Sequence, residues 1–422
     1  MITADRTLLA VGLAVLVLGL SSRLVKKHAL SPVLLALVAG AALGPRALDL
    51  LDPEAAVPRT VLLEQLCRVA LALSVVDIAL RLRPADLRAD ARRLAVLLLV
   101  VMPGMWLVSA LGAGLLLGLP LAVALLLGAA LTPTDPGVAS ALVTGTMPNR
   151  SLPRRVRMSL QGEAAANDGL ALPFVVLSGL LVTLPLGEAL PEVAFEAGRQ
   201  VGVAVVVGLA TGWLAMRVVD WAGVHRLAEE DWFPLAATGL ALTALALAHL
   251  LGGTGVLAAF LAGLVFSEGL PERLREPIHE VHRSVTKVAL AVTFLAFGMV
   301  LPFDLWWSEL GLAGVGFALW VLVLRRLPVA FAAVRATGTG PLSSAFIGWS
   351  GPLGVAGIYY LVHAERYGVP DYERFFAAGS LAITASVLGQ ALLASLAVRG
   401  YRRRTGEEVE EGEELQLAGR LP

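Results

Sequence analysis

An aspartate flanked by prolines lies at the centre of an otherwise apolar stretch, in the run Thr132-Pro133-Thr134-Asp135-Pro136. Each proline removes a backbone N–H and clashes with the preceding helical turn, so a helix should break here and release carbonyl oxygens beside the Asp135 carboxylate. Carbonyl and carboxylate oxygens at the ends of half-helices suit a small hard cation. The alternative is that Asp135 caps a proline-kinked helix. Its depth within the apolar stretch favours the cation site.

The next apolar stretch contains two acids and an amide within six residues, at Glu163, Asn167 and Asp168. Such groups are costly to place in an apolar helix, so each is a candidate functional residue. On a helix Glu163 and Asn167 share a face, whereas Asp168 points about 100° further round. We therefore expect Asp168 to face a transport pathway. Glu163 and Asn167 either act directly or hold helices together through interhelical hydrogen bonds.

Three more charged residues lie in or at the ends of apolar stretches, namely Asp77, Arg325 and Arg326. Asp77 lies within about two helical turns of a basic loop, so either an ion pair with a loop arginine or a role in the pathway fits the sequence. One of the two arginines can extend to the membrane surface, while the other turns inward to a carboxylate such as Glu163.

A second group of helix-breaking residues runs from Gly348 to Gly354. It predicts an interrupted helix at a position that corresponds to Asp135 in the other half of the chain. The offset is about 220 residues and seven apolar segments, which predicts two repeats of opposite orientation joined by the segment 195–219. Two interrupted segments at equivalent positions are typical of a transport site.

Long apolar segments must position these residues, because 57% of the 422 residues are apolar and only 16% are charged. A helix needs about 20 apolar residues to cross a bilayer, and about thirteen such segments are present, which predicts an all-α, multi-pass membrane protein. The segments are 7–24, 31–49, 60–82, 94–118, 120–147, 155–185, 195–219, 232–251, 254–267, 285–303, 308–327, 342–365 and 373–398.

Basic residues gather in the loops after the first, third, fifth, eleventh and thirteenth segments, and acidic residues gather in the loops on the other side. The positive-inside rule then places the N-terminus outside and the C-terminus in the cytoplasm, in the cell (inner) membrane. We expect one transmembrane domain, residues 1–400, and a disordered acidic cytoplasmic tail, residues 401–422.

The formal net charge is zero, so the sequence offers no electrostatic case for binding nucleic acid. Cys67 is the only cysteine, which excludes an internal disulfide and disfavours a cysteine metal site. We expect no cofactor.

Thr134-Asp135-Pro136, the run from Glu163 to Gly169 and the run from Gly348 to Gly354 together resemble the NhaP/NHE-type monovalent cation:proton antiporters, the sodium/hydrogen exchanger family. Their order and spacing agree with the family up to about Arg399. The resemblance implies thirteen helices in two inverted repeats, with discontinuous helices five and twelve that cross, and usually a homodimer.

The resemblance also implies which residues carry the transported ions. Asp168 would be the essential carrier of the cation or proton, with Asp135 and the Thr134 carbonyl contributing to a Na⁺ site. Asp77 would be an indirect ligand. No resident cofactor is implied, since Na⁺ and H⁺ are the transported ions.

Other matched positions are implied to be structural. Glu163 would pair with an arginine, and Arg325 aligns with that arginine better than Arg326 does. Asn167 before Asp168 is typical of the electroneutral branch of the family.

The chain departs from the family pattern at two positions. Ala164 replaces the usual serine, a hydroxyl ligand for the ion, which leaves the choice among Na⁺, Li⁺ and K⁺ open. Leu353 replaces a basic residue that is common there, which leaves regulation and the pH set-point open.

Exchange then follows from competition at one carboxylate. A buried, charged and empty Asp168 is costly to move across the membrane, whereas a proton or a cation neutralises it. A K⁺/H⁺ exchanger on the same fold is one alternative. The other is an intramembrane aspartyl protease using Asp135 and Asp168, although the usual sequence contexts of that class are missing.

Overall fold

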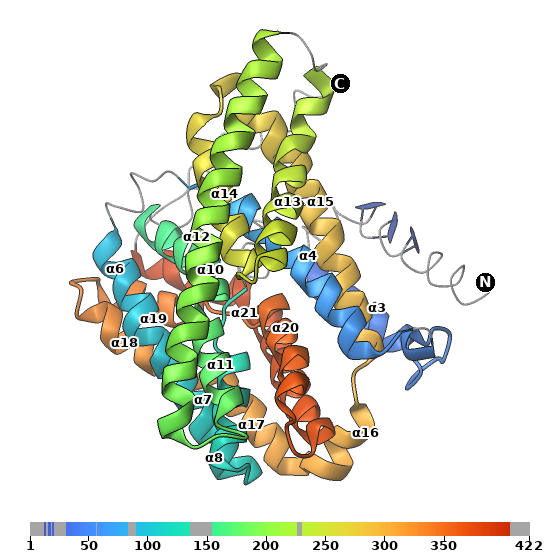
Figure 1. Ribbon diagram of the computed structural model, residues 1–422. Coiled ribbons are helices and arrows are strands. Elements are labelled where there is room, and N and C mark those ends of the chain that lie inside the picture. The colour runs from blue at the N-terminus through green and yellow to red at the C-terminus, as the bar shows by residue number, and fades with distance from the viewer. Residues whose placement is uncertain are drawn as a thin grey trace.

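The computed structural model describes residues 12–13, 16–17, 19–20, 31–55, 57–82, 90–135, 154–225 and 230–405. Within these ranges the regular secondary structure is entirely helical (Figure 1). This agrees with the predicted all-α class.

The first half of the chain forms helices of very different lengths. They are α3 (Pro32–Leu43), α4 (Arg59–Ala79), α6 (Ala91–Val96), α7 (Met102–Leu117), α8 (Leu121–Ala130), α10 (Arg154–Leu170), α11 (Leu172–Leu180) and α12 (Leu186–Val224). A π-helical turn, η2 (Leu97–Val101), joins α6 to α7 without a break, and a short 3₁₀ turn, η1 (Pro53–Ala55), precedes α4.

The second half contains α13 (Ala236–Leu250), α14 (Gly255–Gly269), α15 (Glu272–Met299), α16 (Phe303–Leu305), α17 (Gly311–Val323), α18 (Leu327–Arg335), α19 (Pro341–Trp349), α20 (Val355–His363) and α21 (Tyr372–Thr405). Shorter turns are η3 (Glu230–Leu235), η4 (Trp306–Leu310) and η5 (Ala364–Tyr367). Helix α21 continues to Thr405, beyond the expected boundary at residue 400, and residues 406–422 of the expected tail lie outside the described residues.

Five helical stretches of the described chain are long and apolar enough to cross a membrane: Ala91–Leu117, Leu186–Val224, Trp232–Leu250, Phe303–Arg335 and Tyr372–Leu393. Every predicted segment from 31–49 onward contains at least one helix, and the first, 7–24, lies largely outside the described residues. Fewer stretches than predicted segments pass this test because several are short, interrupted or charged. The expected number of thirteen crossings stays a prediction.

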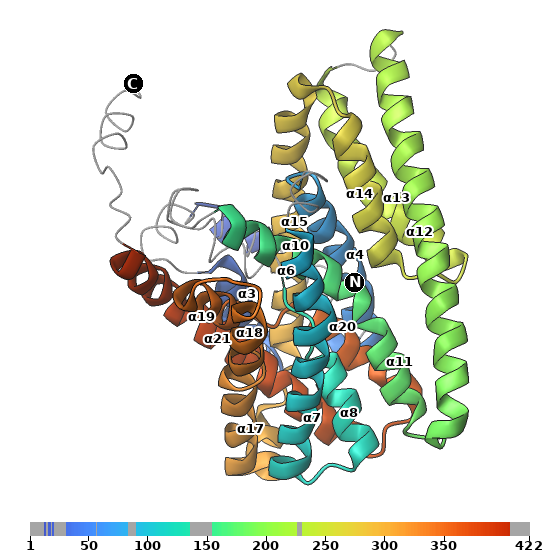
Figure 2. The same cartoon turned by 90° about the vertical axis from the view of Figure 1, so that its left-hand side faces the viewer.

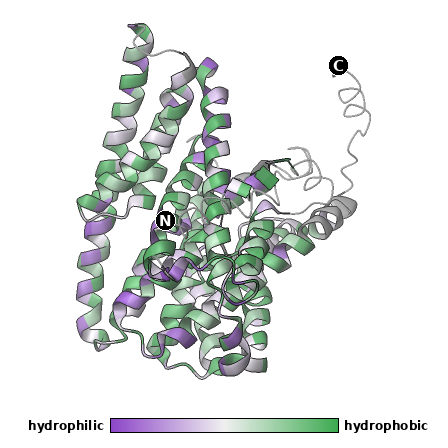
Figure 3. Ribbon diagram, turned by 90° about the vertical axis from the view of Figure 1, so that its right-hand side faces the viewer, coloured by the Kyte–Doolittle hydropathy of each residue, from purple (hydrophilic) through white to green (hydrophobic). Residues whose placement is uncertain are grey.

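Large apolar side chains project outward from the long helices, as expected for a surface in contact with lipid. Leu99 is 74% exposed and Leu312 is 84% exposed. Figure 3 shows hydrophobic residues along most of the length of the long helices. Such a surface would be unstable in water.

Helices α12, α13 and α14 pack side by side, and α4 packs against α14, α15 and α20 (Figures 1 and 2). Small residues permit the closest of these contacts. A Cβ atom on Gly208 of α12 would lie 2.6 Å from the Ala258 carbonyl oxygen of α14, and one on Gly212 would lie 2.5 Å from that of Ala262. Glycines four residues apart thus let two helix backbones touch.

Two helices end abruptly inside the packed bundle. Helix α8 ends at Ala130, and residues 132–135 are not helical. The expected interruption between Gly348 and Gly354 is present, since α19 ends at Trp349 and α20 begins at Val355. The chain after Asp135, residues 136–153, lies outside the described residues, so the second half of the predicted fifth segment is not described.

Candidate functional site

Asp135 lies against the other interruption, at the N-terminal end of α20. Its backbone N–H donates to the Pro352 carbonyl (2.9 Å), and its Oδ2 accepts a hydrogen bond from the Val355 N–H (2.6 Å). The first N–H groups of a helix have no partner within the helix and favour a negative charge, so this carboxylate is held by backbone geometry. Asp135 therefore caps a helix, but this helix begins 220 residues further along the chain.

The approach of Asp135 to α20 requires a glycine. A Cβ atom on Gly354 would lie 2.0 Å from Asp135 Oδ2 and 2.3 Å from its Cγ, well inside van der Waals contact. Any other residue at 354 would displace the carboxylate or the start of α20.

Asn167 of α10 hydrogen-bonds to Thr134, which lies in the non-helical run after α8. The Asn167 Nδ2 donates to Thr134 Oγ1 (2.7 Å), and the Thr134 N–H donates to Asn167 Oδ1 (3.3 Å). Both residues are buried. A broken helix leaves backbone groups without partners, and here an amide side chain supplies one of them. Asn167 thus connects α10 to the non-helical run, with Thr134 as its partner.

Asp168 is 1% exposed, and neither carboxylate oxygen has a hydrogen-bond partner among the described residues. Its carboxylate interacts electrostatically with that of Asp135. Leaving a buried polar group without a partner costs about 1–3 kcal/mol, and more for a charged group. A proton or a cation is the kind of ligand that would supply the missing interaction.

The backbone of Asp168 is held by a residue that the sequence analysis did not single out. The Tyr360 hydroxyl of α20 donates to the Asp168 carbonyl oxygen (2.6 Å). Tyr360 is 3% exposed and belongs to an apolar run, where an aromatic side chain carries little signal in the sequence.

Arg326, not Arg325, binds Glu163, so the sequence alignment that favoured Arg325 was wrong on this point. The Arg326 Nη1 and Nη2 atoms lie 2.5 and 2.7 Å from the two Glu163 carboxylate oxygens. Both side chains are buried. The two arginines lie in the short link between α17 and α18, where successive side chains point in different directions. Of the two arginines, Arg326 is the one that hydrogen-bonds to Glu163 of α10.

Arg325 instead faces the two interruptions. Its Nη1 donates to the carbonyl oxygens of Leu131 (2.7 Å) and Thr132 (3.2 Å), and its Nη2 donates to that of Gly351 (2.5 Å). Arg325 is 2% exposed, so neither arginine extends to the membrane surface.

Asp77 of α4 contacts an arginine and a histidine away from this group. Arg81, one turn later, hydrogen-bonds to the Asp77 carboxylate, and His279 of α15 lies 3.3 Å from its Oδ1. The Arg81 Nε also lies 2.8 Å from His279 Nε2. Arg81 is therefore the loop arginine that pairs with Asp77, and His279 is an additional contact that was not predicted.

The structure thus gathers Asp135, Thr134, Asn167 and Asp168 where the two interruptions meet. In the described part of the chain no three His, Cys, Asp or Glu residues form a cluster that could hold a metal. A cation at this crossing would depend on one or two carboxylates together with carbonyl, hydroxyl or water oxygens, a ligand set suited to a transported alkali ion.

Comparison with known proteins identifies the family. Residues 11–399 match the family model described as sodium/hydrogen exchanger, transmembrane. A Na⁺/H⁺ antiporter of Schizosaccharomyces pombe is 27% identical over 407 residues, which cover 89% of this chain and 84% of that protein. The K⁺/H⁺ antiporter NhaP2 of Shewanella oneidensis is 30% identical over 281 residues, 65% of this chain but only 46% of that protein.

The fold has a counterpart among solved structures. The sodium proton antiporter MjNhaP1 from Methanocaldococcus jannaschii at pH 8 superposes with a TM-score of 0.73 and 19% sequence identity, covering 94% of this chain and 99% of that one. The family consists of transporters, so the protease alternative is wrong. The chain belongs to the sodium/hydrogen exchanger family and is a multi-pass membrane antiporter of monovalent cations and protons.

Proposed function

We propose that the protein exchanges Na⁺ or Li⁺ for H⁺ by alternating access, electroneutrally, with the cation and the proton competing for Asp168. The observation that carries this proposal is the Asp168 carboxylate, which is buried and has no hydrogen-bond partner among the described residues. An empty, charged site is costly to move through a membrane, whereas either ligand neutralises it. The amide at Asn167, in place of a second acid, supports the electroneutral form.

The cation would be held by Asp168, Asp135 and the Thr134 carbonyl. The hydrogen bonds that hold each of these residues in place support this assignment. The N-terminal end of α20 binds Asp135, and Asn167 binds Thr134. Tyr360 binds the backbone of Asp168. Asp77 is better explained by its ion pair with Arg81 and its contact with His279 than by contact with the ion.

Purified protein in proteoliposomes tests the proposal through cation-driven proton flux, followed with a pH-sensitive dye. Asp168→Asn should abolish the flux, because an amide neither takes up a proton nor neutralises a cation. Asp220→Asn, an exposed aspartate on α12, is the matched control and should leave it unchanged. Full exchange in Asp168→Asn would refute the assignment of Asp168 as the carrier of the cation and the proton.

A K⁺/H⁺ exchanger is the second candidate function, and Ala164 is the observation in its favour. This buried alanine offers no side-chain oxygen to a small cation next to Glu163, and the NhaP2 relative is named a K⁺/H⁺ antiporter. Flux measured with Na⁺, Li⁺ and K⁺ in turn decides between the two. A lower apparent KM for K⁺ than for Na⁺ would replace the first proposal with the second.

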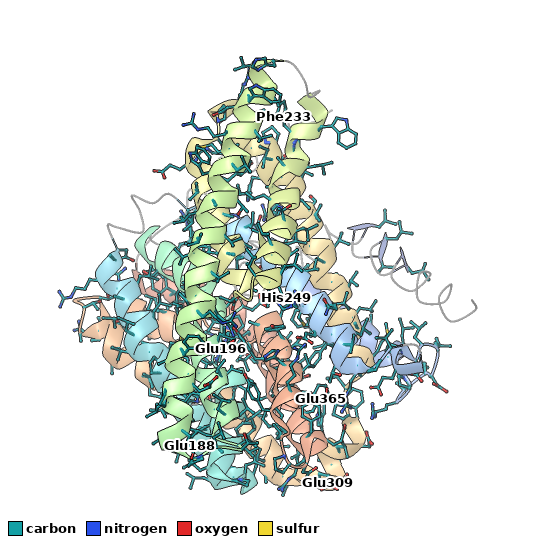
Figure 4. The ribbon with its side chains drawn as sticks, in the orientation of Figure 1. Glu188, Glu196, Phe233, His249, Glu309 and Glu365 are labelled. Atoms are coloured by element: carbon teal, nitrogen blue, oxygen red, sulfur yellow. The ribbon has the colours of Figure 1, made fainter. Side chains whose placement is uncertain are left out.

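We also propose that the N-terminus lies outside and the C-terminal tail in the cytoplasm, and that two inverted repeats assemble as a homodimer. In support of the orientation, Glu188, Glu309 and Glu365 lie toward one end of the molecule (Figure 4), which fits the acidic loops predicted to be outside. Protease treatment of inside-out and right-side-out vesicles tests the orientation, since the tail should be cut only in the former. Mass measurement in detergent tests the dimer.

A further inference from the structure

The carbonyl oxygens that the two interruptions release are not all available to a transported ion. A helix that ends leaves its last carbonyls without intrahelical partners. The carbonyls of Leu131 and Thr132 follow directly after the end of α8, and that of Gly351 lies in the gap between α19 and α20. The guanidinium of Arg325 binds all three, at 2.5 to 3.2 Å.

Arg325 is unusual because its hydrogen bonds go only to neutral carbonyls. Among the described residues no carboxylate hydrogen-bonds to it, while the neighbouring Arg326 takes both oxygens of Glu163. The side chain is 2% exposed, and its planar fork reaches two segments that are far apart in the sequence. A permanent positive charge thus lies among carbonyl oxygens at the crossing.

Rings of carbonyl oxygens are themselves ligands for alkali cations, and their number and field strength decide which cation is preferred. Leu131 and Thr132 are separated from Thr134 and Asp135 by one proline, and Gly351 precedes Pro352, to whose carbonyl Asp135 donates its N–H. The carbonyls that Arg325 binds therefore belong to the same backbone segments as the proposed ion ligands, or to a segment that hydrogen-bonds to them.

We propose that Arg325 acts as an internal cation that occupies these carbonyl oxygens and so restricts the transported ion to Asp168, Asp135 and Thr134. It is a positioning and specificity-determining residue and does not touch the ion. The inference rests on the proposed site at Asp168. It assigns to Arg325 a role separate from the ion pair that Arg326 forms with Glu163.

The test compares Arg325→Met, which removes the charge and all donors, with Arg325→Lys, which keeps a cation in the same place. Both are reconstituted in proteoliposomes, and the apparent KM for Na⁺, Li⁺ and K⁺ is measured across a range of pH. Arg335→Met is the matched control, because Arg335 is an exposed arginine on α18 that donates to the nearby Thr339 carbonyl.

In Arg325→Met the freed carbonyls and the water that joins them become ligands. The ratio of the apparent KM values for K⁺ and Na⁺ should change by about threefold or more. The pH of half-maximal flux should also move to the alkaline side, because a buried positive charge is lost beside the backbone that leads to the Asp135 carboxylate. Arg325→Lys should keep the wild-type ratio and pH profile at a reduced rate.

A folded Arg325→Met protein with the wild-type KM ratio and pH profile would overturn the proposal, even if its thermal stability fell, because Arg325 would then only cap carbonyls. If Arg325→Met fails to fold, Arg325→Lys decides: a KM ratio altered by threefold or more in that variant would refute the internal-cation role, and an unaltered ratio supports it. Absence of exchange by the wild-type protein with every alkali cation would instead refute the proposed function.

Discussion

Asn167 and Thr134 hydrogen-bond to each other twice, through the side-chain amide of one and both the hydroxyl and the backbone N–H of the other. The pair joins the last turn of α10 to the non-helical run that follows α8. Asp168 comes directly after Asn167, and Asp135 comes directly after Thr134. This contact therefore fixes the backbone position of both acids relative to each other.

Asn167→Ala should therefore lower both stability and transport. The Thr134 N–H and hydroxyl would lose their partner in a buried place, at a cost of about 1–3 kcal/mol. Thermal unfolding in detergent measures the first effect and cation-driven proton flux the second. Gln65→Ala, an exposed amide on α4, should change neither. An Asn167→Ala protein as stable as the wild type would show that the contact is dispensable.

Gly354→Ala should reduce cation-driven flux about tenfold or more, because the added methyl group overlaps Asp135 Oδ2 and must displace it from the start of α20. Gly316→Ala on α17 is the control, since a Cβ atom there meets nothing within 4 Å. Equal flux in the two variants would contradict the close approach of Asp135 to Gly354.

Removing one partner of the buried Glu163–Arg326 pair should destabilise the protein by about 3–5 kcal/mol. The double variant Glu163→Gln/Arg326→Leu should lose less than the sum of the two single losses, because neither buried charge is then left alone. Unfolding measured for all four proteins gives the coupling. The same cycle with Arg199 and Glu196, an exposed pair on α12, should give a coupling near zero. Additive losses for Glu163 and Arg326 would contradict the pair.

Asp77→Asn should leave the apparent KM for Na⁺ within about twofold of the wild type, since the Asp77 side chain contacts Arg81 and His279 and not the crossing. Its thermal stability should fall, because the half-buried Arg81 loses its carboxylate partner. A tenfold rise in the apparent KM with unchanged stability would return Asp77 to the ion pathway, as the family resemblance implies.

The interruptions and the acids could be predicted because their signals are local. Proline on either side of Asp135, and glycine and proline between Gly348 and Gly354, break a helix wherever it lies. A charged residue within an apolar stretch can likewise be recognised from the local sequence, because such residues are rare in membrane-spanning helices.

The partners could not be predicted, because they depend on tertiary packing. Nothing near Asp135 in the sequence indicates that Val355 supplies its hydrogen bond. The choice between Arg325 and Arg326 depended on how the link between α17 and α18 turns, which alignment by position does not report. Tyr360 was not predicted because an aromatic residue in an apolar run is usually a packing residue, whereas here its hydroxyl forms the hydrogen bond to Asp168.

Helix α20 is only nine residues long, yet it contacts both acids of the crossing. Its first N–H binds the Asp135 side chain, and its Tyr360 hydroxyl binds the Asp168 backbone about one and a half turns later. As long as α20 stays helical, it works as a spacer of fixed length between the two acids. A displacement of α20 would carry Asp135 and Asp168 together, whereas unwinding it would separate them.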